Sequence, residues 1–312
     1  MNKEGVKEYF EKNAESWILD GYRDDGHNYP VAYHRLRIVN SILQRVETIG
    51  KAVDLGCGGG DVSIMMVENN FDVTGVDQSQ KMIEIANKRI LNLNREIGDR
   101  IRFINSPLNE SALPSNEFDI CTAMGVIGYL TTDEILFNTA ADLLKPGGLF
   151  LLSCRNRLFN MQSVSFRTAD EIRNGEAIAL IDELDELYKE ISLKSANEML
   201  EKLKQIANDL QKNEEYDAEK AKSPSEKYAD QPQENNFEPR QHTPKRLKAV
   251  AEKCGFELEE YIGVHPHLMD ARLNKLLPPQ VFNKISGCLE VLESEPFALT
   301  CSSVFIGVFK KK

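Results

Sequence analysis

Apolar and polar positions alternate along the first half of the chain in blocks that predict strands separated by helices. Short apolar runs of strand length occupy positions 51–55, 71–76, 101–104, 118–124 and 149–154. Helical spacing of apolar residues covers 61–69, 79–93 and 133–144, and the last block is followed by the terminator KPGG at 145–148. Strands separated by helices of this length are typical of βαβ units. The pattern therefore predicts a Rossmann-like, doubly wound and mostly parallel sheet of the α/β class.

The pattern changes after Cys154. Positions 176–211 show helical spacing with a slip near 192–195, which predicts two helices or one bent helix, and the polar stretch 213–241 predicts a loop. Helical spacing resumes over 245–254 after Thr243-Pro244. Strand-like runs at 256–264 and 297–309 predict an antiparallel pair at the sheet edge. These two strands bring the predicted sheet to seven, with a helical insertion after the fifth.

The charge of the chain is concentrated in that insertion. The 312 residues carry a net charge of −11, of which −9 falls on 169–240 and −2 on the rest. We therefore expect an N-terminal helical cap over 1–50 and a near-neutral core formed by 51–155 and 241–312. The acidic helical insertion over 156–240 would act as a lid or as a homodimer contact, because its apolar stripes need a packing partner.

Composition excludes several classes of protein. Without an apolar run of about 18 residues, we expect no membrane span, and the charged start predicts no secretory signal. The acidic balance argues against nucleic acid as a partner. Six cysteines occur singly with no CxxC pair, which indicates reduced thiols in a cytoplasmic protein and predicts no metal site.

A glycine-rich turn follows the first predicted strand. The run Val53–Gly60 reads VDLGCGGG, and glycines there let the backbone turn sharply and approach a ligand. Asp77 ends the second strand, where a carboxylate can accept both hydroxyl protons of a ribose. The alternative role for Asp77 is to cap the helix that begins near Ser79. A carboxylate after a glycine turn points to a nucleotide-like ligand at the carboxyl ends of the strands.

Two ligand classes fit this pattern, dinucleotides and S-adenosylmethionine. In the dinucleotide fingerprint G-x-G-x-x-G, the third glycine would fall on Asp61, whose charge would repel a pyrophosphate. S-adenosylmethionine has no phosphate and carries a cationic sulfonium, so that carboxylates nearby are favourable. Asp61 therefore favours S-adenosylmethionine as the cofactor.

These motifs resemble class I S-adenosylmethionine-dependent methyltransferases, in particular the small-molecule branch that includes the ubiquinone/menaquinone-type enzymes. The glycine run and the stretch Gly75–Met82 carry the resemblance, and Leu113-Pro114 before Phe118-Asp119 and the run Leu143–Gly148 match later landmarks. It covers about 1–155 well and 243–312 loosely. The acidic residue that the family often has after the third strand is absent here, so that Ser106, Asn109 or the backbone would accept the adenine amino group.

The resemblance implies a set of cofactor-binding residues. Asp54, Gly56 and Gly58 would surround the methionine moiety, Asp77 would hold the ribose, and Gln78 and Met82 would flank the adenine. Other expected contacts are Cys57, Ser106, Met124 and, from a covering N-terminal helix, Tyr33 with Tyr9 or Tyr22. Phe10 and Trp17 read as core of that helix. Arg35 is equally compatible with the cofactor carboxylate and with a surface ion pair.

Catalytic and acceptor-binding residues follow from topology and chemistry. An oxygen acceptor must lose a proton, which histidine can take near neutral pH. We expect His265 or His267 as the base, with a capped loop as the alternative reading. The pair also suggests a metal, but no third ligand is nearby in sequence, and we predict none. The expected catalytic and substrate contacts further include Tyr129, Arg155, Arg157 and His34. For Arg155 and Arg157, capping and solvating the start of the insertion is the equally weighted alternative.

The predicted function is methyl transfer from S-adenosylmethionine to a hydroxyl of a small polar metabolite (a natural product, sugar or quinone-like ring) by in-line displacement. The alternatives are a small-molecule N-methyltransferase, a nucleic-acid methyltransferase and a non-catalytic partner protein with this fold. Ala123–Val126 stands where amino-methylating nucleic-acid enzymes carry an Asp/Asn-Pro-Pro-Tyr/Phe turn, which disfavours that class. A dehydrogenase is disfavoured by Asp61.

Overall fold

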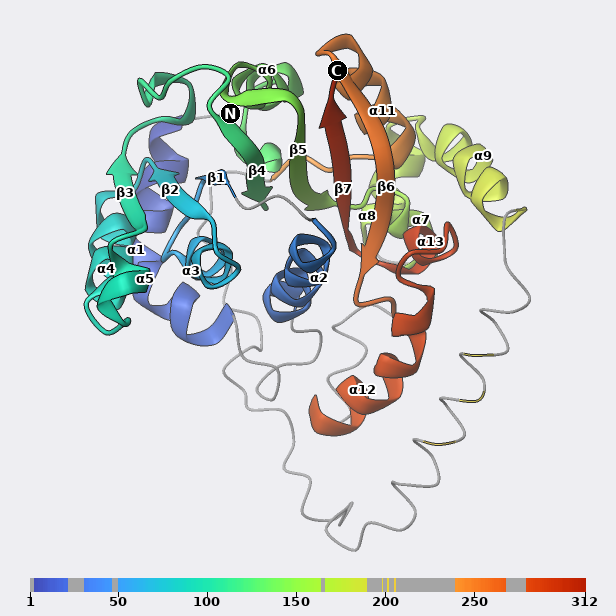
Figure 1. The fold of residues 1–312 in the computed structure, drawn as a ribbon. Helices are drawn as coiled ribbons and strands as arrows, with labels where there is room; N and C mark the ends of the chain where they lie inside the picture. Colours follow the sequence, from blue (N-terminus) through green and yellow to red (C-terminus); the bar gives the residue numbers. More distant parts are fainter. Residues whose placement is uncertain are drawn as a thin grey trace, which may run out of the picture.

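A single seven-stranded sheet forms the centre of the computed structural model (Figure 1). The structure describes residues 3–21, 31–46, 50–163, 166–189, 239–267 and 279–312, together with the single residues 198, 201 and 205. The strands are β1 (Lys51–Leu55), β2 (Asp72–Asp77), β3 (Ile101–Asn105), β4 (Phe118–Met124), β5 (Leu144–Arg155), β6 (Phe256–Val264) and β7 (Val304–Lys311). Their order is β3-β2-β1-β4-β5-β7-β6. All neighbours are parallel except β7, which is antiparallel to β5 and β6.

Helices cover both faces of this sheet. They are α1 (Lys3–Gly21), α2 (Val31–Arg45), α3 (Asp61–Glu68), α4 (Gln80–Ile90), α5 (Arg95–Gly98), α6 (Asp133–Leu143), α7 (Phe159–Gln162), α8 (Phe166–Arg173), α9 (Ala177–Tyr188), α11 (Pro244–Lys253), α12 (Pro279–Ser286) and α13 (Ala298–Cys301). Short 3₁₀ turns are η1 (Leu108–Glu110), η2 (Ile127–Tyr129) and η5 (Gly287–Leu292). The predicted α/β class and mostly parallel seven-stranded sheet are confirmed.

Alternating side chains of the strands build a separate core on each face. On one face α2 and α3 pack Val39 and Met66 against the strands, and on the other α6 and α11 pack Phe137 and Leu247. Burial of such side chains is the main favourable term in folding. Because the parallel strands end at one edge, the segments that follow β1, β4, β5 and β6 meet there. No helix among the described residues has the length and apolar character to cross a membrane.

The prediction for 297–309 is wrong in its first part. Residues Ala298–Cys301 form helix α13, and β7 begins only at Val304. The reason is a long-range contact, because the buried amide of Asn156 donates to the carbonyls of Leu299 and Ser302 at 2.6 and 2.8 Å. The antiparallel pairing itself is confirmed. The KPGG terminator also lies differently, since α6 ends at Leu143 and β5 already begins at Leu144.

The segment after β5 is helical where the structure describes it. The buried side of α9 is formed by Ala177, Leu180 and Leu184, whereas Ile181 is 46% exposed. Most of the predicted second helix and of the loop 213–241 lies outside the described residues. The chain is described again from Pro239, where Arg240 N donates to the Gly128 carbonyl at 2.8 Å.

Candidate functional site

The glycine turn after β1 is shaped by positive backbone dihedrals and by close neighbours. Gly56 has φ +72° and Gly58 φ +51°, values that favour glycine. A Cβ at Gly56 would lie 2.4 Å from Val126 Cγ2, whereas one at Gly58 would find only Met82 Sδ, at 4.0 Å, among the described atoms. The backbone at Gly58 therefore faces open space beside Met82, on the side where a ligand is expected.

Asp77 joins this turn to helix α4. Its Oδ2 accepts from Gly58 N at 3.0 Å, and its Oδ1 accepts from Ser79 N at 2.8 Å. The N-cap of α4 is Ser79, whose hydroxyl accepts from Met82 N at 3.2 Å. Burial raises the pKa of Asp77. Each carboxylate oxygen can still accept a second hydrogen bond, so Asp77 can hold ribose hydroxyls while bracing the turn.

Asp54 lies beneath the turn and points into the protein. It is 1% exposed, and its two oxygens accept from Ser63 Oγ at 2.7 Å and Thr122 Oγ1 at 2.8 Å. Burial raises its pKa to about 6. These bonds tie β1 to α3 and β4, so Asp54 supports the turn from below. Cys57, also buried, has its pKa raised well above the usual value by burial, which keeps its thiol protonated and unreactive.

Arg89 neutralises Asp61, the residue that distinguished the two ligand classes. The guanidinium of Arg89 lies 2.7 Å from Asp61 Oδ1 and donates to the Gly59 carbonyl at 2.8 Å. Arg89 is on α4, 28 residues further along the chain than Asp61. The sequence gives no local signal for this pair, because only the packing of α4 beside the glycine turn brings Arg89 and Asp61 together.

Helix α1 lies over the carboxyl edge of the sheet. The Glu11 carboxylate accepts from Gln80 N at 2.7 Å and Lys81 N at 3.1 Å, so it caps the N-terminus of α4 from another helix. The ring of Phe10 meets the edge of Tyr129 with centroids 5.4 Å apart. Helix α1 thus spans from α4 to η2. The predicted lid residue Tyr22 lies outside the described residues, and Tyr33 on α2 is 36% exposed.

The ends of β4 and β5 are joined by Arg35 from α2. Its Nη1 donates to Ser153 Oγ at 3.2 Å, and a Cβ on Gly125 would lie 2.6 Å from that nitrogen. Arg35 Nε is buried and has no hydrogen-bond partner among the described residues. Arg35 therefore places a guanidinium, a group that pairs well with carboxylates, against the backbone of Gly125 at the end of β4.

The remaining predicted residues near the carboxyl edge of the sheet differ in how far their side chains are exposed. Met82 is 2% exposed, while Gln78, Ser106, Met124 and Tyr129 are partly buried and Arg155 is exposed. Burial raises the pKa of Tyr129, and the guanidinium groups of Arg155 and Arg35 act in the opposite direction. Tyr129 is therefore a protonated phenol near neutral pH, able to donate a hydrogen bond.

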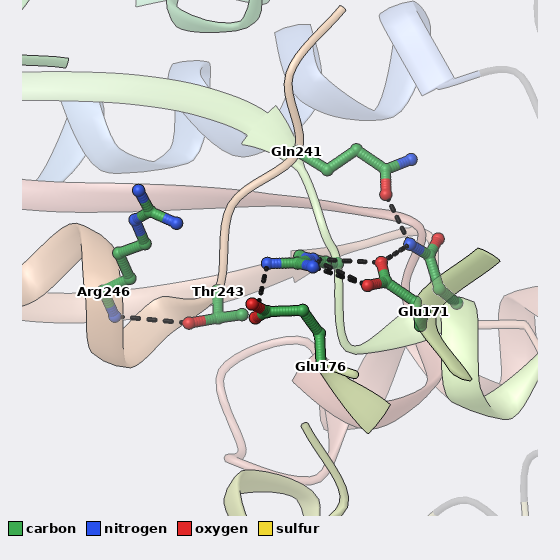
Figure 2. A network of polar contacts seen from close by, with 7 residues as sticks. Glu171, Glu176, Gln241, Thr243 and Arg246 are labelled. Carbon is green, nitrogen blue, oxygen red and sulfur yellow. Dashed lines mark hydrogen bonds and ion pairs between the residues drawn. The ribbon is translucent and has the colours of Figure 1, made fainter. Parts of the chain in front are cut away.

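Arg157 is held by carboxylates of the insertion. Its guanidinium lies 2.5 Å from Glu171 and 3.3 Å from Glu176, and the pKa of Glu171 is lowered although burial opposes this. Figure 2 shows Glu171 and Glu176 of the insertion pointing toward the same guanidinium, which is that of Arg157. Gln241, from the segment that leads to α11, accepts instead from Asn160 at 2.5 Å. This network borders a cavity of about 400 Å³. Arg157 therefore binds the insertion to the end of β5.

The three predicted histidines meet in one buried cluster. His265 follows β6 with φ +47°, an unfavourable value for a residue with a side chain, and its ring centroid is 4.1 Å from that of His34. His267 Nδ1 contacts the His265 carbonyl at 2.9 Å. Burial lowers the pKa of His265 to about 2 and that of His34 to about 4. Such imidazoles are neutral, but His265 accepts a proton poorly, which argues against it as the base.

Comparison with known proteins gives consistent similarities. Residues 52–148 match a family model described as a methyltransferase domain. A ubiquinone biosynthesis O-methyltransferase of Vibrio parahaemolyticus is 27% identical over 164 residues, 52% of this chain and 65% of the relative. Another, from a Caulobacter species, is 36% identical over 107 residues, 34% of this chain and 41% of the relative. The chain therefore spans less than two thirds of the length of these relatives.

Solved structures are similar to this chain over nearly its whole length. One of them is magnesium protoporphyrin IX methyltransferase from Synechocystis PCC 6803 with bound SAH, with a TM-score of 0.57 and 12% identity over 99% of both chains. At this identity the likeness shows the fold alone.

The buried acid Asp54 predicts a specific pH dependence of stability. Its folded pKa is raised from 3.8 to about 6, so the stability it contributes is full below the unfolded pKa and is lost as pH rises through the folded one. We expect the difference in unfolding free energy between Asp54→Asn and the native chain to shift by about 3 kcal/mol in favour of the variant when the pH is raised from about 3 to about 7. Urea unfolding at several pH values measures this, with exposed Asp142→Asn as the control. If the free-energy difference between Asp54→Asn and the native chain did not change with pH, the raised pKa of Asp54 in the folded chain would be contradicted.

The contact of Glu11 on α1 with the first backbone N–H groups of α4 predicts that the amides of α1 are protected from hydrogen exchange. Glu11→Gln removes the charge that caps two backbone donors, and we expect hydrogen exchange in residues 3–14 to speed up by roughly twofold to fivefold. The matched control is Glu8→Gln, because Glu8 is exposed on the same helix. Equal exchange in both variants would show that the contact of Glu11 does not hold α1 in place.

Proposed function

We propose that this chain, whose residues 52–148 form a class I S-adenosylmethionine-dependent methyltransferase domain, transfers a methyl group from S-adenosylmethionine to a small polar organic molecule. The observation that carries the proposal is the glycine turn braced by Asp77, with the open backbone of Gly58 at the carboxyl end of β1. Open α/β sheets bind ligands at this edge. The named relatives of this domain support the same chemistry.

The cofactor would lie along the ends of β1, β2 and β4. In this placement Asp77 accepts the ribose hydroxyls, Gln78, Met82 and Ser106 border the adenine, and the methionine part extends past Gly56 and Gly58. Arg35 would hold the methionine carboxylate, a role supported by the close approach of its guanidinium to Gly125 at the end of β4. Asp54 and Cys57 act from beneath, through the backbone that they support.

When bound, S-adenosylmethionine supplies a methyl group already activated by its positive sulfur. The protein's task is then to align an acceptor in line with that methyl group and to exclude water. Helix α1 excludes water from above, since Glu11 and Phe10 fasten it on both sides of the site. Tyr129 and Arg155, at the ends of β4 and β5, would position a polar acceptor through hydrogen bonds.

We favour a hydroxyl as the acceptor group. Tyr129 stays protonated and can donate a hydrogen bond to an oxygen or accept one from a hydroxyl. The curated relatives that match this domain are named for O-methylation, which supports the same choice.

The insertion over 156–240 would cover the acceptor or join two copies of the chain. The ion pairs of Arg157 support the first role, because they fasten α8 to the end of β5. Exposed apolar side chains support the second: Ile172 is 62% exposed and Ile178 is 70% exposed.

Replacement of Asp77 tests the cofactor site. We expect Asp77→Ala to weaken S-adenosylmethionine binding by roughly 1–3 kcal/mol, because hydrogen bonds to a charged acceptor would be lost. Isothermal titration measures the dissociation constant, and thermal melting verifies that the variant is folded. Asp72→Ala, on the same strand but outside the site, should bind as the native chain does. An unchanged constant in Asp77→Ala would exclude a ribose contact.

A panel of acceptors tests the reaction. The protein is incubated with S-adenosylmethionine and small molecules that carry a phenol, a sugar hydroxyl or an amine, and products are identified by mass spectrometry. We expect methylated oxygen and S-adenosylhomocysteine in equal amounts. Transfer only to nitrogen would reject the hydroxyl, and the absence of cofactor binding would reject the enzymatic function.

A further inference from the structure

A buried polar cluster lies at the carboxyl end of β6, where three distant parts of the chain meet. His34 comes from α2, His265 follows β6, and Glu290 belongs to η5. One ligand atom from each of these side chains lies within 4.8 Å of the other two. We propose that His34, His265 and Glu290 form a binding site for a divalent transition metal of the zinc class.

His34 supplies the first argument. It is 6% exposed, and its Nδ1 is buried without a hydrogen-bond partner among the described residues. Glu290 Oε1 lies 3.6 Å from this nitrogen. Two ligands of one tetrahedral zinc ion, each at about 2.0–2.1 Å, are roughly 3.3 Å apart. The pair is therefore close to the separation that a shared metal would set.

Hydrogen bonds orient the other two ligands. Ser286 Oγ lies 3.0 Å from His265 Nε2, and metal-binding histidines commonly use one ring nitrogen for the metal and the other for such a contact. Ser286 thus assigns Nδ1 of His265 to the metal. The guanidinium of Arg37 lies 3.7 Å from Glu290 Oε2 and 2.5 Å from Glu293 Oε1, which turns Oε1 of Glu290 toward His34.

The charge of the cluster suits a cation with nitrogen ligands. Both imidazoles are buried, with His34 6% and His265 0% exposed, and neutral imidazole is the form of histidine that binds metals. Two carboxyl groups, Glu290 and Glu293, face the single guanidinium of Arg37. Two imidazoles and one carboxylate are a ligand set of zinc sites that keep a fourth position open.

The inference is independent of the proposed methyl transfer, because none of its ligands belongs to the cofactor site. It also revises the expectation of no metal, which rested on the lack of a third ligand near His265 and His267 in sequence. The fold supplies the missing ligands from α2 and η5 instead.

Metal binding to the 312-residue chain tests the site. Protein treated with a chelator is titrated with Zn²⁺ by calorimetry and with Co²⁺ by visible absorption. We expect one equivalent of each, a Co²⁺ spectrum of nitrogen and oxygen ligands without sulfur-to-metal charge transfer, and a raised melting temperature with Zn²⁺.

Variants separate this site from the six cysteines and from surface carboxylates. Glu290→Gln and His34→Gln should each weaken Zn²⁺ binding by roughly 100-fold or more, since loss of a ligand costs more than the 10–100-fold lost when a residue that only orients a ligand is changed. The control Glu259→Gln removes an exposed carboxylate on β6 and should bind as the native chain does. The proposal fails if the folded native chain binds no metal, if binding survives Glu290→Gln and His34→Gln, or if Co²⁺ shows thiolate ligation.

Discussion

The carboxylate of Asp77 is the contact on which the candidate site depends. It accepts from Gly58 in the turn after β1 and from Ser79 at the start of α4, and so it fixes the first two βα connections of the sheet relative to each other. The positive φ angles of Gly56 and Gly58 are compatible with this bridge only because these residues have no side chain. The same geometry leaves the backbone of Gly58 open. A single carboxylate thus braces the turn and faces the space where the cofactor is proposed.

The surroundings of this bridge are held by charges drawn from other elements. Asp54 ties the turn to Ser63 and Thr122 from below, at the cost of burying a carboxyl group whose pKa rises to about 6. Glu11 holds α1 above, by capping α4. Both interactions satisfy backbone or hydroxyl donors with a carboxylate. The site is therefore a stack of three layers, each of which depends on an acidic side chain with hydrogen-bond donors around it.

The cluster of His34, His265 and Glu290 at the end of β6 differs from this site because it contains buried histidines as well as a carboxylate. Its histidines are neutral because burial disfavours their charged forms, and it contains strained backbone at His265. Strain in a buried polar group persists only where the surroundings impose it, and it is frequent at functional sites.

The acidic insertion, which carries most of the net charge of the chain, is attached to the end of β5 through Arg157 and Glu171. The acidic residues of the insertion thus take part in anchoring it as well as in keeping it solvated.

The sequence by itself determined the features that depend on local pattern. Alternating apolar blocks specified β1 to β5 and α3, α4 and α6 within a few residues, because strand and helix periodicities are properties of adjacent residues. The glycine run followed by Asp77 located the turn and its carboxylate, because both lie at predictable strand ends. Only the tertiary structure decided which distant side chains meet. Glu11 at α4, Arg89 at Asp61 and the Asn156 amide that turns 298–301 into a helix have no local signature. The meeting of His34, His265 and Glu290 is of the same kind, since residues more than 200 positions apart become neighbours only through packing of α2 and η5 around β6.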